Sequence, residues 1–178
     1  LLEAGVRWVC LGIESASSAI RKDVSKGSFK EVDIVKAVEN IHAAGVEIMA
    51  NYIVGLPNDT QETMQATLDL SIELNTSAWN MYAATALPGS ALYLKALDEG
   101  IPLPETYSGY SFHSYDHLPM PTSYLMAADI LKFRDEAFHT YHNHPNFRSR
   151  ILRLFGDEAI RNLDELTSIK LKRKILGD

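Results

Sequence analysis

The chain has little cysteine, no long apolar run and no excess of basic residues. Its 178 residues include one cysteine, Cys10, which excludes an intrachain disulfide and any metal site made of cysteines alone. No apolar stretch approaches the roughly 20 residues that a membrane-spanning helix needs. The net charge of −6 and the pI near 5.5 argue against nucleic-acid binding. We therefore expect a cytoplasmic protein that has neither a nucleic acid nor a membrane as its partner.

The first residues contain neither an initiator Met nor the charged and apolar regions of a secretory signal. Leu1, Leu2 and Ala4 precede Gly5, as they would at the end of a helix. We therefore expect the chain to have been cut from a longer one. Its composition, 46% apolar and 22% charged, is typical of a globular domain with a core of its own.

Three apolar runs rich in β-forming residues are separated by helical patterns. The runs cover residues 6–13, 46–54 and 78–87 and predict three strands. Strands separated by helices imply right-handed crossovers and a parallel sheet. Because the runs are nearly continuously apolar, both faces of the sheet are expected to be covered, with Cys10 as a small core residue.

The helices between the strands have recognisable ends. Ser28 and Glu31 form the S-x-x-E pattern of a capping box, and Asp59 or Thr60 can cap the second helix. A third helix is predicted over residues 90–99, before Gly100.

Beyond Gly100 the composition changes. Residues 101–122 are rich in proline and aromatic residues and predict a packed loop or lid. Helices are predicted over 123–142, 146–155 and 157–175. The basic cluster at 170–174 is interpreted as a solvated helix face, and His139, His142 and His144 as surface histidines rather than metal ligands.

Polar residues follow the first two strands where ligands bind in parallel α/β folds, at the carboxyl ends. Glu14 ends the first strand, and its carboxylate could bind a ligand, cap a helix or pair with Arg21 or Lys22. Asn51 lies inside the second strand, where its amide could contact a ligand or bond a neighbouring strand. Gly55 permits either a plain turn or the close approach of a ligand.

Four segments, taken together, resemble a known family. They are GIES at the end of the first strand, a Lys-Gly pair further on, NYIVGLPNDTQET, and LPGSALY. This set resembles the second half of the radical S-adenosylmethionine (radical SAM) core, in the branch associated with cobalamin-binding domains and coproporphyrinogen oxidase. The resemblance implies an α/β fold: a parallel β/α half-barrel, the last three strands of a partial TIM-type barrel, in residues 1–100. The loop 101–122 and an all-helical C-terminal extension, 123–178, follow.

The resemblance also implies roles for single residues. Glu14 and Asn51 match positions that hydrogen-bond ribose hydroxyls, and Lys26 matches a cation that reaches the methionyl carboxylate. Ile53, Leu87 and Pro88 match adenine contacts. The cofactor-binding residues so implied are Glu14, Ser15, Lys26, Asn51, Ile53, Gly55, Leu87 and Pro88. No catalytic residue or metal ligand is expected in this chain, because the cluster motif CxxxCxxC is absent from it.

The function implied belongs to the full-length enzyme. With a 4Fe-4S cluster bound outside this chain, S-adenosylmethionine would yield a 5′-deoxyadenosyl radical for hydrogen abstraction or methyl transfer on a small-molecule substrate, and cobalamin is a further candidate cofactor. The chain alone is expected to be inactive and to self-associate through two exposed sheet edges. The alternatives are a stand-alone nucleotide- or metabolite-binding module and an assembly domain, both without redox chemistry.

Overall fold

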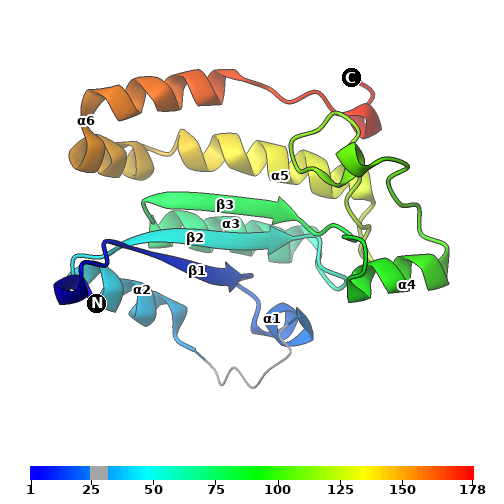
Figure 1. Ribbon diagram of the computed structural model, residues 1–178, viewed down its shortest axis with the longest axis horizontal. Helices are drawn as coiled ribbons and strands as arrows, with labels where there is room; N and C mark the ends of the chain where they lie inside the picture. The colour runs from blue at the N-terminus through cyan, green and yellow to red at the C-terminus, as the bar shows by residue number, and fades with distance from the viewer. Residues whose placement is uncertain (25–31) are drawn as a thin grey trace.

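Three parallel strands form one sheet in the computed structural model, which describes residues 1–24 and 32–178. The strands are β1 (Trp8–Glu14), β2 (Glu47–Val54) and β3 (Ala78–Ala83), in the order β1-β2-β3. All three arrows point the same way in Figure 1. The predicted α/β fold with a parallel sheet is therefore confirmed, and the third strand ends four residues earlier than the apolar run suggested.

Helices connect and follow the strands. They are α1 (Ser18–Val24), α2 (Ile34–Ala43), α3 (Gln61–Leu74), α4 (Ala91–Glu99), α5 (Ala127–His142) and α6 (Pro145–Ser168), with short 3-10 turns at Leu2–Ala4 (η1), Tyr107–Tyr110 (η2) and Lys174–Leu176 (η3). Thr60 caps α3 and Ser90 caps α4, while Gly100 ends α4 with a positive φ of 65°.

Two helix starts differ from the sequence prediction. The predicted capping box of Ser28 and Glu31 lies outside the described residues, and the described part of α2 begins after Asp33, whose carboxylate accepts from the Lys36 N–H at 2.9 Å. The helix α1 was not predicted from the sequence. Its start is tied by Ser17 Oγ, which accepts from the Ile20 N–H.

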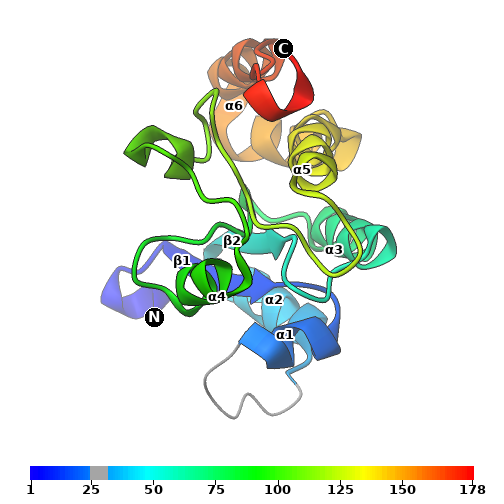
Figure 2. The same ribbon diagram turned by 90° about the vertical axis from the view of Figure 1, so that its right-hand side faces the viewer.

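The core lies on one face of the sheet. From β2, Ile48, Ala50, Tyr52 and Val54 are fully buried. They pack with side chains of α3 and α5, such as Met64 and Ile130. Figure 2, seen from the carboxyl ends of the strands, shows α3 and α5 on this side of the sheet.

The other face of the sheet, here called the open face, is formed by the alternate strand residues. They are Trp8, Cys10, Gly12 and Glu14 from β1, Glu47, Met49, Asn51 and Ile53 from β2, and Ala78, Asn80 and Tyr82 from β3. All are exposed or partly exposed, and Figure 1 looks onto this face, with α3 behind the sheet. Among the described residues, the sheet is covered on one face rather than on both, and Cys10 is exposed rather than part of the core. Both expectations from the sequence are therefore wrong.

The two edges of the sheet differ. Beside β3, Arg134 Nε of α5 donates to Met81 O at 2.9 Å, and Tyr141 Oη donates to Thr76 O just before the strand. The outer edge of β1 has no strand beside it among the described residues. The prediction of two exposed edges therefore holds for β1 and is wrong at Met81.

The C-terminal region is less helical than predicted. The helix α6 turns sharply at Gly156, where φ is 77°, and ends at Ser168 rather than 175. The segment after it returns to the loop 101–122, beside which Figure 1 places the chain's red end. Arg173 is fully buried there, so the interpretation of 170–174 as a solvated face is wrong at this residue. In the described ranges, no helix combines the length and apolarity that crossing a membrane requires.

Candidate functional site

A row of polar groups crosses the middle of the open face. Gly12, Asn51 and Asn80 are register partners on the three strands, so their side-chain positions point the same way. Asn51 Nδ2 donates to Cys10 Sγ at 2.8 Å, and Asn80 Nδ2 donates to Asn51 Oδ1 at 2.9 Å. The Asn51 amide thus makes the inter-strand bond that the sequence left open, and it keeps one N–H and one lone pair for a ligand.

Glu14 places its carboxylate at one end of this row. Its backbone has a positive φ of 66°, which is uncommon for a residue with a side chain. Its Oε1 lies 2.6 Å from the position that a Cβ on Gly12 would take, so the carboxylate lies over Gly12 on the open face. Burial raises the pKa of Glu14. No hydrogen bond or ion pair joins this carboxylate to any described residue, so it is free to accept from a ligand.

Ile53 and Gly55 continue β2 towards its carboxyl end. Ile53 lies on the open face and packs with Ile20, Leu56 and Ala84. Gly55 has a φ of 78°, and a Cβ there would lie 2.5 Å from Ile130 of α5, so the packing of α5 as well as the turn requires glycine.

Asp59 fastens the turn that follows. It is 1% exposed, and its Oδ2 accepts from the Leu56 N–H at 2.9 Å while its Oδ1 accepts from Thr63 Oγ1 at 2.7 Å. Burial raises the pKa of Asp59 against these hydrogen bonds. The Gly-Leu-Pro-Asn-Asp turn is therefore held from inside by one carboxylate.

The remaining predicted site residues lie in different places. Leu87 and Pro88 are exposed beyond the carboxyl end of β3. Ser15 is fully buried, and its Oγ lies 3.2 Å from Thr67 Oγ1 of α3, away from the open face. Lys26 lies outside the described residues. The structure thus brings Glu14, Asn51 and Ile53 together on one surface, and it sets Ser15 and Gly55 behind that surface.

Sequence reasoning missed four residues of this surface. Gly12 and Asn80 follow from the two-residue alternation along β1 and β3, which could have identified them. Tyr82 is the next open-face residue of β3, and its ring centroid lies 4.8 Å from that of Phe112. No local signal in the sequence could have placed Phe112 there, because it comes from the loop 101–122.

The helix α6 meets the open face at the N-terminal ends of the strands. Phe155 stacks on Trp8 with ring centroids 6.0 Å apart, and Arg150 pairs with Glu47 at 2.6 Å. Ser77 also donates to Glu47. Partial burial opposes ionisation of Glu47, but the hydrogen bonds from Ser77 and Arg150 outweigh it and lower the pKa. The helix α6 therefore packs against the N-terminal end of the open face, away from the row of polar groups.

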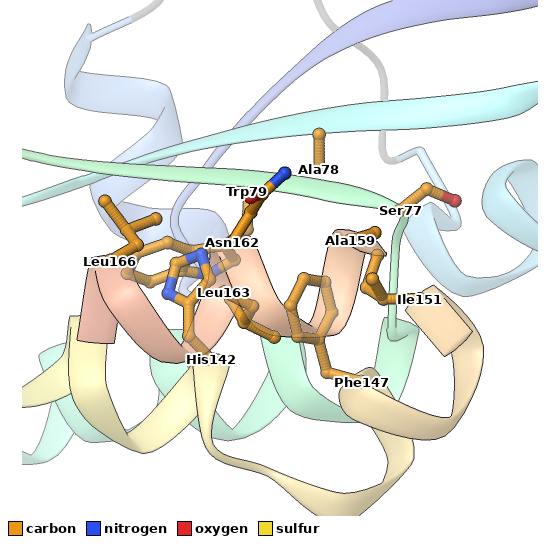
Figure 3. A pocket seen from close by; sticks show the side chains of 10 residues that line it. All are labelled: Ser77, Ala78, Trp79, His142, Phe147, Ile151, Ala159, Asn162, Leu163 and Leu166. Atoms are coloured by element: carbon orange, nitrogen blue, oxygen red, sulfur yellow. The ribbon is translucent and has the colours of Figure 1, made fainter. Parts of the chain in front are cut away.

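A separate cavity of about 300 Å³ lies between the start of β3, the end of α5 and α6. Figure 3 shows its mainly apolar lining, in which His142 lies beside Trp79 and Leu163. His142 is 7% exposed and its Nδ1 donates to Phe138 O at 2.8 Å, so its interpretation as a surface histidine is wrong. The cavity lies away from the carboxyl ends of the strands, and we do not assign it to the site.

No metal centre is formed by the described side chains. Among residues 1–24 and 32–178 there is no group of three or more His, Cys, Asp or Glu arranged to hold a metal ion. The single cysteine, Cys10, bonds Asn51 and cannot by itself supply the thiolates of an iron–sulfur cluster.

Comparison with known proteins supports the fold. The chain is 29% identical over 109 residues to an uncharacterized methyltransferase of Pyrococcus horikoshii, covering 61% of this chain and 24% of that protein. It is 25% identical over 95 residues to the bacteriochlorophyllide d C-12(1)-methyltransferase of Chlorobaculum tepidum, covering 53% of this chain and 21% of that protein. The matched part is therefore less than a quarter of each relative.

The family model of the Radical SAM superfamily matches residues 1–71. This segment contains β1, β2, most of α3 and the open-face residues Glu14, Asn51 and Ile53. Over residues 1–71 the chain is thus similar to the Radical SAM superfamily.

Proposed function

We propose that this chain is the nucleoside-binding C-terminal part of a radical SAM enzyme that transfers a methyl group or abstracts hydrogen from a small molecule. The observation that carries the proposal is the Glu14 carboxylate, partly buried on the open face and without a partner among the described residues. A carboxylate in such a place is costly unless a ligand donates to it. The two methyltransferase relatives support the reaction class.

The open face offers complementary groups to S-adenosylmethionine. Glu14 would accept a hydrogen bond from a ribose hydroxyl, and the remaining N–H and lone pair of Asn51 would bind the neighbouring hydroxyl. Ile53 provides apolar contact for the adenine ring, with Leu87 and Pro88 beyond β3. These residues would bind and orient the nucleotide, while α6 packs against the N-terminal ends of the strands.

The residues present fit the nucleotide and do not fit the cluster. A 4Fe-4S cluster bound by another part of the full-length protein would supply the electron that cleaves S-adenosylmethionine. Because this chain has one cysteine, the 178 residues alone are expected to be inactive. Cobalamin is a further candidate cofactor of the full-length enzyme.

Calorimetric titration of the chain with S-adenosylmethionine tests the proposed site. We expect Glu14→Gln and Asn51→Ala each to weaken binding by about tenfold, because each removes one hydrogen bond, charged in the case of Glu14. Glu39→Gln, on the exposed side of α2, is the matched control and should bind like the wild type. Equal binding by all four proteins would refute the site.

The genomic sequence upstream of the Leu1 codon tests the reaction class independently. An in-frame CxxxCxxC motif would establish radical chemistry for the full-length protein. A start codon at Leu1 without that motif, together with S-adenosylmethionine binding, would instead support the stand-alone binding module.

A further inference from the structure

The loop 101–122 brings an aromatic side chain onto the open face beside the polar row. Phe112 packs on Tyr82 with ring centroids 4.8 Å apart and planes inclined by 47°. Tyr82 is the register partner of Ile53, one step beyond Asn80 towards the carboxyl end of β3. Both rings are partly exposed. The residues of β1 and β2 that are proposed to bind the nucleotide thus have an aromatic wall beside them at β3. This pair of rings is here called the Tyr82–Phe112 wall.

The loop that carries Phe112 is fixed at its C-terminal end and by the buried side chain of His117. The Met120 N–H donates to Ala84 O at 2.8 Å, which joins the loop to the end of β3. His117 is 2% exposed, packs edge-on to the Phe112 ring at 5.6 Å and lies 3.2 Å from Gly109 O through Nδ1. The position of Phe112 is therefore set by buried contacts rather than by the loop tip alone.

Arg173 connects this loop to the helical region. Its side chain is fully buried and binds Asp135 of α5 through two nitrogens, at 2.8 and 2.9 Å. Its Nη1 donates to Ser114 O of the loop at 2.9 Å, and the next residue, Lys174, donates its N–H to Tyr115 O at 2.8 Å. One side chain thus links α5, the C-terminal segment and the loop two residues from Phe112.

The charge on the open face restricts what can bind against this wall. The three strands contain no Lys, Arg or His, so they present no cation to a phosphate or carboxylate. Their two carboxylates are Glu47, which is paired with Arg150 at the far end, and Glu14, which has no partner among the residues that the structure describes. Aromatic rings and amides without a cation favour a flat, uncharged ring whose edge carries hydrogen-bonding atoms.

We propose that the Tyr82–Phe112 wall stacks against a planar, uncharged, conjugated ring of the substrate, and that Arg173 is the positioning residue of this wall. Asn80 lies next to the wall and its amide meets the polar edge of the ring. This inference rests on the proposed function, because it assigns the substrate side of the same open face.

Riboflavin and its phosphate ester FMN are suitable probes, since they share one planar ring and differ in a phosphate. Fluorescence titration with the 178-residue chain should show that riboflavin binds more tightly than FMN. Phe112→Leu and Tyr82→Leu should each weaken riboflavin binding by about tenfold, since stacking of one base on one aromatic ring has effects of that order. Phe112→Tyr should retain the binding.

Trp8→Leu is the matched control, because Trp8 is an exposed aromatic of the same face that stacks on Phe155 at the opposite end. It should bind riboflavin like the wild type. An equal loss in Trp8→Leu, tighter binding of FMN, or no riboflavin binding by the wild type would each overturn the inference.

The positioning role of Arg173 has its own signature. Arg173→Ala should weaken riboflavin binding as Phe112→Leu does, and the double variant should show no further loss. Independent, multiplying losses would show that Arg173 acts only on general stability. If circular dichroism shows that Arg173→Ala does not fold, Arg173→Lys takes its place. Lys keeps the positive charge but cannot form the bidentate hydrogen bond to Asp135.

The same proteins distinguish this inference from the proposed function. Phe112→Leu should bind S-adenosylmethionine like the wild type. Loss of S-adenosylmethionine binding in the wild type with riboflavin binding retained would refute the nucleotide site alone. The reverse result would refute the Tyr82–Phe112 wall alone.

Discussion

The Glu14 carboxylate occupies the space that a Cβ on Gly12 would fill. Oε1 of Glu14 lies 2.6 Å from the place of a Cβ on Gly12, a separation that real Cβ contacts do not reach. Gly12 adopts no positive φ, so its backbone conformation does not demand glycine. The absent Cβ therefore serves the carboxylate two residues further along the same strand.

We expect Gly12→Ala to displace the Glu14 carboxylate and to weaken S-adenosylmethionine binding by about tenfold, the effect of one hydrogen bond to a charged group. Thermal unfolding should change little, because the new methyl group lies on the open face. In a Glu14→Ala background the same substitution should add no further loss, and calorimetric titration of the four proteins measures this. A full additional tenfold loss in that background would show that Gly12 acts independently of Glu14.

Stability should depend on pH through Glu14. Burial raises the pKa of Glu14 in the folded chain above the ordinary 4.5. Between the pKa of the unfolded chain and that of the folded chain, the folded state therefore retains a proton that the unfolded chain has lost. The stability contributed by Glu14 therefore falls as the pH rises through this window and stays constant above it. Urea unfolding from pH 4 to pH 8 should show the wild type losing stability relative to Glu14→Gln. Curves that stay parallel across this range would contradict the expected shift.

Asp59→Ala should destabilise the chain by about 1–3 kcal/mol, because it leaves the buried Leu56 N–H without its acceptor. Asp59→Asn keeps an acceptor oxygen and should cost less. The matched control is Asp69→Ala on the exposed side of α3, with an expected change within about 0.5 kcal/mol. Urea unfolding at pH 7 measures all three, and equal losses at both aspartates would argue against the turn-fastening role.

His117 should weaken the fold in acid. Its burial is the main cause that lowers its pKa to about 4, from an ordinary value of 6.5. The unfolded chain takes up this proton first as the pH falls, so stability declines between about pH 6.5 and pH 4, by at most about 3 kcal/mol. His117→Gln should remove this part of the decline. Ring-proton NMR gives the midpoint directly, and a titration near 6.5 would show that the ring is solvated.

The chain by itself is expected to self-associate. The outer edge of β1 has no neighbouring strand among the described residues, and the open face exposes Trp8 by 42% and Met49 by 39%. Light scattering at increasing concentration should show dimers or larger species, reduced by Trp8→Glu. Tyr107→Ser, at a side chain 90% exposed in the loop, should leave the association unchanged. A single monomeric species at high concentration would contradict the expectation.

Local patterns in the sequence were sufficient for the strands and for several helix ends. Thr60, Ser90 and Gly100 act where their residue types predict, because capping depends on backbone groups within a few residues. The face that Cys10 occupies was beyond such patterns. A continuous apolar run contains both sets of alternate residues, and nothing in the run tells which set the helices will cover.

The candidate site was predictable where it lies on the strands and not where it depends on distant segments. Glu14 was singled out from its position at a strand end, Asn51 as an amide inside a strand, and Ile53 from the family resemblance. The buried role of Ser15, by contrast, depends on Thr67, 52 residues away. Arg173 was missed for the same reason, since its partner Asp135 lies 38 residues earlier. Composition alone assigns such a residue to solvent, and only tertiary contact reveals it.

The contact of α6 with the N-terminal ends of the strands has a consequence for biosynthesis. Glu47 and Arg150 are separated by 103 residues, so their ion pair can form only after synthesis has passed residue 150. Before residue 155 is synthesised, Trp8 lacks the stacking contact with Phe155, and β1 lacks this contact with the C-terminal region. A chain whose synthesis stops before residue 155 would therefore lack the ring that stacks on Trp8 at the start of β1.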